Sequence, residues 1–350
     1  MSLMRVTSPH AHSGQSTSKV MLQVAAATIP GILALVVFFG IGVLINIAIC
    51  VLTALAAEAA VMKLRGRPVG FYLKDYSAFV TALLLGIAIP AYCPWWIPVI
   101  GTVTAIVLAK QLYGGMGYNP FNPAMVGYVV LLISFPVAMT RWVGPAELIY
   151  GTPGLGETFS LIFGNMNVDG FTRATPLEIV RHNESTILSQ LYEMEPVFSK
   201  GAVAGMGWEM ANFGFLLGGL FLLFRRLITW HGPVAMLATL SILSVLFYDG
   251  GSSLSEGSPL LHLFSGATML GAFFIVTDPV SGCTSNKGRL IFGAGVGVLV
   301  FVIRAWGAYP DAVAFAVLLM NFAAPFIDNY TLPRTYGHKA PRKATDLEEQ

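Results

Sequence analysis

Long apolar runs, separated by short polar, glycine- or proline-containing breaks, make up most of this 350-residue chain. A helix needs about 20 predominantly apolar residues to cross the hydrocarbon core of a bilayer. By that criterion the pattern predicts ten membrane spans, at residues 21–39, 41–62, 77–89, 95–112, 122–139, 208–224, 233–247, 262–276, 290–302 and 312–327. The runs at 77–89 and 290–302 are short for a full crossing. The sequence therefore predicts an all-α integral membrane protein.

The composition supports this class and excludes others. Hydrophobic residues make up 55% of the chain and charged residues 11%, whereas a soluble domain carries roughly 25% charged residues. A net charge of +2 gives no reason to expect a nucleic-acid partner. The three cysteines, Cys50, Cys93 and Cys283, form no CxxC pair. We therefore expect buried, inert thiols and no metal site.

Lysine and arginine residues set the predicted orientation, because cytoplasmic connections carry an excess of them. Most of the 20 fall on one side of the membrane if both termini are cytoplasmic. The predicted organisation is then a cytoplasmic tail (1–20), a five-helix unit (21–140), an outer, periplasmic loop (141–207), a second five-helix unit (208–328) and a cytoplasmic tail (329–350).

The two five-helix units resemble each other. In the first, the run at 77–89 is followed by Pro90, a helix and the sequence GGMGYNPFNPAMVGYVVLL. In the second, the run at 264–277 is followed by Asp278-Pro279, a helix and WGAYPDAVAFAVLLM. Five spans per unit is an odd number, so the units must lie in opposite orientations. Inverted repeats of this kind build a binding site where proline-broken helices meet.

The outer loop carries the sequence DGFTRAT at residues 169–175. The pattern Asp-x-x-(Ser/Thr)-x-Ala-Thr resembles the flavinylation motif of ion-translocating redox complexes, in which a flavin transferase joins FMN to the last threonine through a phosphoester. The resemblance implies that Thr175 is the attachment residue and that Asp169, Thr172 and Ala174 form the recognition frame. We expect the hydroxyl on an exposed, flexible segment.

The same residues also have a purely structural interpretation. A turn at 169–175 can lead into a helix capped by Thr175, with Pro176 at the first helical position and Glu178 at the third. The two interpretations are compatible. A second stretch, SGAT at 265–268, matches the end of the motif, but it has His262 where the motif has Asp and lies inside an apolar span. We expect Thr268 to be inaccessible and to belong to a helix-packing face.

Three further segments extend the resemblance, namely GMGYNPFNPAMVGY (115–128), SGATMLGAFFIVTDPVSG (265–282) and FAAPFIDNYTLPRTYG (322–337). They are similar to the D subunit of Rnf-type ion-translocating oxidoreductase complexes and, more distantly, to the B subunit of the sodium-translocating NADH:quinone oxidoreductase. The likeness covers residues 21–337. It implies a bacterial inner-membrane location, the other Rnf subunits (A, B, C, E and G), the flavin transferase and membrane lipid as partners, and a second, non-covalent flavin, riboflavin.

Two polar groups near the cytoplasmic surface match this second flavin: Asn119 and Asn122 in NPFNP, and Thr277 and Asp278 in TDPVSG. Amide and carboxylate groups hydrogen-bond an isoalloxazine edge or ribityl hydroxyls, so we expect Asn122 or Asp278 to contact riboflavin. The alternative is that these residues cap broken helices. Glu58, an ionisable residue within the second span, either snorkels toward nearby lysine and arginine residues or takes part in ion transfer.

The predicted function is that of a flavin-carrying membrane subunit. Its complex would couple ferredoxin/NAD redox chemistry to sodium or proton movement, with covalent FMN passing electrons across the membrane. No GxGxxG fingerprint or cysteine cluster is present, so partner subunits would handle NAD and ferredoxin. The alternative is an inverted-repeat channel or transporter for a small neutral solute.

Overall fold

The computed structural model describes residues 16–149, 151–164, 166–183, 185–253, 255–307, 309 and 312–331. The regular secondary structure of these residues is helical. Their one β-type contact is an isolated antiparallel bridge between Val143 and Thr172. The predicted all-α class is therefore confirmed.

Helices before and after the outer loop form two groups. The first group is α1 (Thr17–Ala27), α2 (Ile29–Phe39), α3 (Gly42–Leu64), α4 (Val69–Leu73), α5 (Ser77–Ala88), α6 (Trp96–Val103), the π-helix η1 (Thr104–Gln111), α7 (Pro123–Ser134) and α8 (Pro136–Thr140). The second group is α13 (Trp208–Phe224), α14 (His231–Leu246), the short 3-10 helix η2 (Asp249–Gly251), α15 (Pro259–Phe264), α16 (Thr268–Leu270), the π-helix η3 (Gly271–Ile275), α17 (Asn286–Trp306) and α18 (Val313–Thr331). Between them, the outer loop contains α9 (Leu155–Phe163), α10 (Pro176–Arg181), α11 (Leu188–Met194) and α12 (Pro196–Ser199).

Among the described residues, four helices are long and apolar enough to cross a membrane, at Thr17–Phe39, Gly42–Leu64, Asn286–Trp306 and Val313–Thr331. Five apolar helices are shorter, at Ser77–Ala88, Trp96–Gln111, Pro123–Ser134, Trp208–Phe224 and His231–Leu246. The run expected at 290–302 is longer than the apolar pattern indicated, because the Ser285 side chain caps the helix and its polar first turn is helical too. The run expected at 262–276 is interrupted between α15 and α16.

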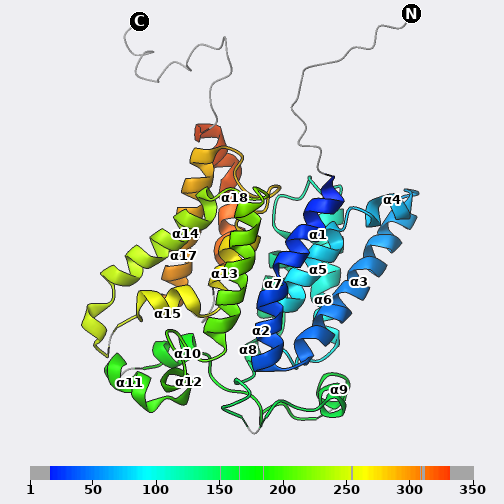
Figure 1. Ribbon diagram of the computed structural model, residues 1–350. Helices are drawn as coiled ribbons and strands as arrows, with labels where there is room; N and C mark the ends of the chain where they lie inside the picture. The colour runs from blue at the N-terminus through cyan, green and yellow to red at the C-terminus, as the bar shows by residue number, and fades with distance from the viewer. Residues whose placement is uncertain are drawn as a thin grey trace, which may run out of the picture.

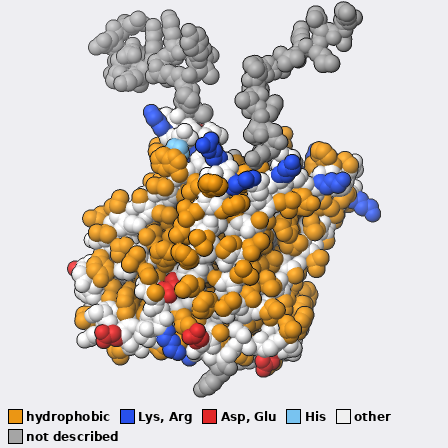
Figure 2. Space-filling view, in the orientation of Figure 1, with side chains coloured by type: hydrophobic (Ala, Val, Ile, Leu, Met, Phe, Trp, Pro, Cys, Tyr) orange, Lys and Arg blue, Asp and Glu red, His pale blue; other side chains and the backbone are white. Residues whose placement is uncertain are grey.

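The two helix groups stand side by side (Figure 1). The start of α1, α4 and the end of α18 lie at one end of the molecule, and α9 to α12 lie at the other. Lysine and arginine side chains gather at the first end (Figure 2). We call these the basic end and the loop end.

Contacts between the groups are close because small residues face each other. Helix α2 packs along α13, and α7 packs against α18. A Cβ atom added to Gly214 in α13 would lie only 2.7 Å from the Cα atom of Gly31 in α2. Glycine at such a crossing lets two membrane helices approach backbone to backbone.

Candidate functional site

The segment that carries the DGFTRAT motif is fastened to the start of the outer loop. The Gly144 amide donates to the carbonyl of Phe171, and the Arg173 amide donates to the carbonyl of Trp142, both at 3.0 Å. These hydrogen bonds flank the Val143–Thr172 bridge. Residues 171–173 are thereby held against residues 142–144, immediately before Thr175.

Thr175 is the N-cap residue of α10. Its Oγ1 accepts a hydrogen bond from the Glu178 amide at 3.3 Å, and the Glu178 carboxylate accepts one from the Thr175 amide at 2.8 Å. Pro176 occupies the first turn. This reciprocal arrangement is a capping box, so the structural interpretation of these residues is confirmed.

The expectation of an exposed acceptor hydroxyl is wrong. Arg173 and Ala174 are exposed, but Thr175 is only 8% exposed. Capping turns the threonine side chain back over the first turn of α10, toward the protein interior. The recognition frame lies outside this buried position: Asp169 pairs with Arg141 at 3.7 Å on the surface, and the Thr172 hydroxyl donates to the carbonyl of Asp169 at 3.2 Å.

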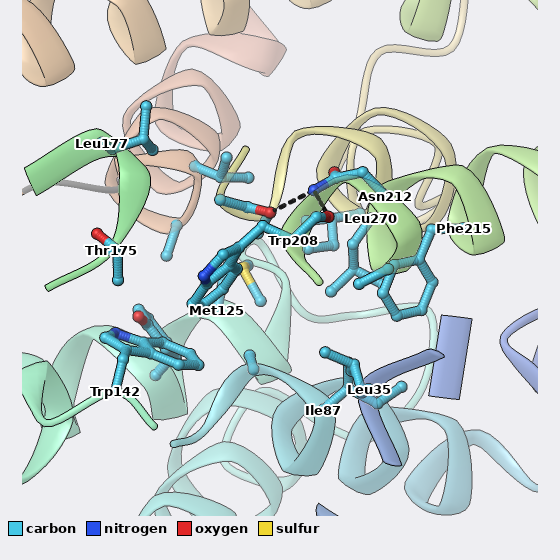
Figure 3. Close-up of a pocket in the computed structure, with 18 residues that line it drawn as sticks. Leu35, Ile87, Met125, Trp142, Thr175, Leu177, Trp208, Asn212, Phe215 and Leu270 are labelled. Carbon is cyan, nitrogen blue, oxygen red and sulfur yellow. Dashed lines mark hydrogen bonds between the residues drawn. The ribbon is translucent and has the colours of Figure 1, made fainter. Parts of the chain in front are cut away.

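A cavity opens beside Thr175, between the two helix groups (Figure 3). We call it the loop-end cavity. It is lined by Leu35, Ile87, Ala88, Met125, Tyr128, Trp142, Thr175, Leu177, Trp208, Ala211, Asn212, Phe215, Gly266, Ala267, Leu270, Ile275, Val313 and Ala314. These residues come from both groups and from the outer loop and are mostly apolar, with Trp142 on the same side as Thr175 (Figure 3). Hydropathy alone gave no signal for Tyr128, Trp142 or Trp208 as lining residues.

Asn212 is a second buried polar residue of this cavity, and its side chain hydrogen-bonds the broken helix opposite. Its Nδ2 lies within 3.0 Å of the carbonyls of Trp208, Phe264 and Gly266. Its Oδ1 accepts from the Met269 amide at 3.1 Å. A single amide side chain therefore hydrogen-bonds backbone groups on both sides of the break between α15 and α16.

Thr268, in the partial copy of the motif, is fully buried. Its hydroxyl oxygen lies 2.7 Å from the carbonyl oxygen of His262 and accepts from Arg304 Nη2 at 3.0 Å. The expectation that this threonine is inaccessible agrees with its burial.

A second cavity lies toward the basic end, and we call it the basic-end cavity. Asn119, Asn122, Thr277 and Asp278 all line it, together with Lys110. The two polar segments singled out in the sequence, which are far apart along the chain, therefore meet in one cavity.

Asn122 and Asp278, the two residues expected to contact riboflavin, also form hydrogen bonds with local backbone. Asn122 caps α7, with its Oδ1 accepting from the Ala124 and Met125 amides at 3.0 and 3.3 Å. The Asp278 carboxylate accepts from the Val280 amide at 3.3 Å and from the Ser281 hydroxyl at 2.6 Å. Burial raises the pKa of the Asp278 carboxyl above its ordinary value. The capping alternative is thus present in the structure for both residues.

Glu58 neither snorkels nor reaches the surface. It is 1% exposed, and its Oε1 accepts from Lys110 Nζ at 2.5 Å and from Gln111 Nε2 at 2.7 Å. Lys110 also donates to the Ser77 hydroxyl at 2.7 Å. The snorkelling interpretation is wrong because η1 brings a cation to Glu58 inside the protein, a contact that hydropathy does not reveal.

Within the described part of the chain, no group of three or more His, Cys, Asp or Glu residues is arranged to hold a metal ion. The three cysteines are buried and free.

Comparison with known proteins assigns the chain to a family. The model of the NQR2, RnfD, RnfE family matches residues 4–337. The chain belongs to this family. It is 58% identical over 350 residues to the D subunit of the ion-translocating oxidoreductase complex of Ectopseudomonas mendocina, covering 100% of both chains. It is 56% identical over 349 residues to the corresponding D subunit of Cellvibrio japonicus, covering 99% of this chain and 98% of the relative. The D subunit of Aliivibrio salmonicida is 53% identical over 352 residues, with coverage of 97% and 99%.

Proposed function

We propose that this chain is the flavin-carrying membrane subunit of an ion-translocating oxidoreductase complex. In this proposal, FMN is joined to Thr175 and electrons pass between it and a second flavin, riboflavin, held nearer the other membrane surface. The observation that carries the proposal is the placement of Thr175, the last residue of the motif, at a cavity between the two helix groups.

The proposal includes ten membrane spans arranged as two inverted five-helix repeats. Counting spans in chain order, α1–α2 is the first, α7 the fifth, α13 the sixth and α18 the tenth. The pairs that would correspond, first with sixth and fifth with tenth, pack against each other. Contacts between equivalent spans are expected where such spans lie next to a two-fold axis in the membrane plane. Two cavities at opposite ends of one interface fit the same symmetry.

The loop-end cavity suits FMN in its chemistry. An isoalloxazine ring is flat and largely apolar, and the indole rings of Trp142 and Trp208 with the phenol of Tyr128 offer aromatic surface. Thr175 would bind the phosphate through its hydroxyl oxygen. The hydrogen bonds that hold residues 171–173 against residues 142–144 would fix the position of this attachment point. A flavin supplies one- and two-electron transfer when bound; the protein's part is to position it and to exclude water.

The basic-end cavity suits riboflavin, which has no phosphate. Its lining combines apolar side chains, including Phe273 and Phe274, with the amide of Asn122 and the carboxylate of Asp278. The Nδ2 group of Asn122 makes no hydrogen bond to another described residue, so it remains a donor for a ligand. Each Asp278 oxygen keeps capacity to accept a ribityl hydroxyl besides its local partner.

The basic end would face the cytoplasm, because lysine and arginine gather there. The loop end, with Thr175, would then face the periplasm of a bacterial inner membrane. The other Rnf subunits would supply ferredoxin and NAD chemistry, and a flavin transferase would attach the FMN. Because Thr175 is buried, the transferase would act while residues 171–175 are released from residues 142–144.

The test is the fluorescence of covalently bound flavin. The protein, made in a host that contains the transferase, is run on a denaturing gel under ultraviolet light and its intact mass is measured. We expect a fluorescent band and an FMN-sized mass increment that Thr175→Asn abolishes. Asparagine caps helices as well as threonine does, so this variant loses the acceptor hydroxyl but keeps α10 capped.

The matched control is Thr152→Val, which removes a threonine hydroxyl at an exposed position of the same outer loop and should keep full fluorescence. A dark wild-type band would contradict the proposal and favour the transporter alternative, for which the motif has no purpose.

A further inference from the structure

Helix α9, in the outer loop, has an apolar face that the rest of the described protein leaves uncovered. Leu155, Phe159 and Phe163 are 62%, 52% and 49% exposed. They are spaced four residues apart, so they form one stripe along the helix. The rings of Phe159 and Phe163 stack with centroids 5.8 Å apart.

A second face of α9 attaches it to the first helix group. Thr158, Leu161 and Ile162 are buried. The carbonyl of Ile162 accepts a hydrogen bond from the Trp95 amide at 3.1 Å, in the break between α5 and α6. Figure 1 shows α9 at the loop end beneath this group, apart from α10 to α12.

The remaining face is polar or small, and it consists of Gly156, Glu157 and Ser160. Each residue turns an α-helix by about 100°, because one turn takes 3.6 residues. On that geometry this face lies roughly 145° from the buried face, and the apolar stripe lies between them, about 105° from each. The buried face of α9 attaches the helix to the loop end of the first helix group. The polar face therefore points away from the membrane, and the apolar stripe points roughly along the membrane plane.

The apolar stripe continues a lipid-facing surface. Along α6 and η1, the side chains of Ile100, Val103, Leu108 and Leu112 are exposed on one side. Trp95, 46% exposed, lies at the loop end of this series, and its backbone amide is hydrogen-bonded to α9. Tryptophan at such a position marks the boundary between lipid and water.

The other half of the outer loop behaves differently. The large apolar side chains Leu177, Val180, Leu188, Val197 and Phe198 of α10 to α12 are buried in a cluster of their own. The only charged side chain of α9, Glu157, is engaged at the helix start, where it accepts from the Gly154 amide at 3.2 Å. The apolar stripe of α9 is therefore neither buried within the described protein nor interrupted by a charged side chain.

We propose that α9 lies in the interface of the outer membrane leaflet, with Leu155, Phe159 and Phe163 inserted among phospholipids. An amphipathic helix in this position buries its apolar face about 5–10 Å into the boundary between headgroups and acyl chains. In doing so it holds the outer loop against the membrane surface. This inference depends on the membrane placement of the helices and not on the presence of flavin.

Site-directed spin labelling tests the proposal in the assembled complex, reconstituted in phospholipid nanodiscs. Nitroxide is placed at Phe159→Cys on the stripe and at Ser160→Cys on the polar face of the same helix. Leu52→Cys, in the middle of α3, gives a lipid reference and Ser199→Cys, in α12, gives a water reference. The three native cysteines are buried, and protein without an added cysteine gives the blank.

Collisions with oxygen, which partitions into lipid, are compared with collisions with the nickel–EDTA-diacetate complex, which stays in water. We expect the oxygen-to-nickel ratio at residue 159 to exceed that at residue 160 by roughly threefold or more and to stay below that at residue 52, because the stripe sits at interfacial depth. A ratio at residue 159 equal to that at residue 199 would place the stripe in water and overturn the proposal. Low collision rates with both reagents would mean that another subunit covers the stripe, and would also overturn it. Covalent flavin fluorescence, measured on the same samples, reports the proposed function separately.

Discussion

Buried asparagines stabilise the interruptions in the helices of this protein. Asn46 donates to the carbonyl of Pro90 at 2.8 Å, at the break between α5 and α6. Asn212 serves the break between α15 and α16. The Asn321 side chain donates to the carbonyl of Ser281 at 3.0 Å and accepts from the backbone amide of Asn122 at 3.1 Å. An amide side chain both donates and accepts, so it replaces the backbone partners that an interrupted membrane helix loses.

At this scale we predict a strong dependence on the Glu58–Lys110 pair. Lys110→Met leaves the Glu58 carboxylate buried without its cation, which should lower the free energy of unfolding by roughly 3–5 kcal/mol. Thermal unfolding of the purified protein in detergent measures this as a fall in midpoint temperature. The exposed charge variant Lys63→Met should change stability by less than about 0.5 kcal/mol.

The double variant Glu58→Met/Lys110→Met should recover much of the lost stability, because a buried ion pair replaced by apolar side chains is often close to neutral. Single and double variants that lose stability additively would show that the two side chains are not coupled.

Among the secondary-structure elements, α2 and α13 pack closely because glycine residues face each other at their contact. The Gly31 and Gly214 backbones approach closely where the two helix groups meet, and this contact also sets the distance across the loop-end cavity, since Leu35 of α2 and Ala211 and Phe215 of α13 line it.

We predict that Gly214→Ala destabilises the protein by about 1–3 kcal/mol, because its new methyl group would meet backbone that cannot move without separating the helices. The readout is again the midpoint of thermal unfolding. Gly70→Ala, in α4, adds the same methyl group where no heavy atom lies within 4 Å. Equal midpoints for the two variants would contradict the close crossing.

On the scale of the whole molecule, the two ends differ in their content of basic side chains. Lysine and arginine side chains gather at the basic end, and the loop end carries the motif (Figures 1 and 2). Since cytoplasmic connections are rich in these residues, the basic end should be cytoplasmic.

Cysteine accessibility in intact cells tests this orientation. Ser199→Cys at the loop end should react with a membrane-impermeant thiol reagent added outside. Arg67→Cys at the basic end should react only after the inner membrane is permeabilised. Labelling of Arg67→Cys in intact cells, with none at Ser199→Cys, would mean that the chain lies in the opposite orientation.

Local patterns in the sequence predicted the features that depend on neighbouring residues. Apolar runs predicted the helices, the order Thr175-Pro176-x-Glu178 predicted the capping box, and Pro90 predicted the end of the run that forms α5. The motif at residues 169–175 and the three family segments pointed to the family that the comparisons then identified. Each of these follows from the preferences of a few consecutive residues or from similarity to other sequences.

The tertiary structure alone decided what distant segments do to one another. The partner of Glu58 lies 52 residues away along the chain, and Asn122 and Asp278 share a cavity because two helix groups meet there. Thr175 is buried although the residues just before it are exposed, since capping turns its side chain inward. Hydrophobicity determines which segments enter the membrane, but packing between helices determines which polar groups meet inside it, because that choice depends on helix crossings and rotations that no local pattern encodes.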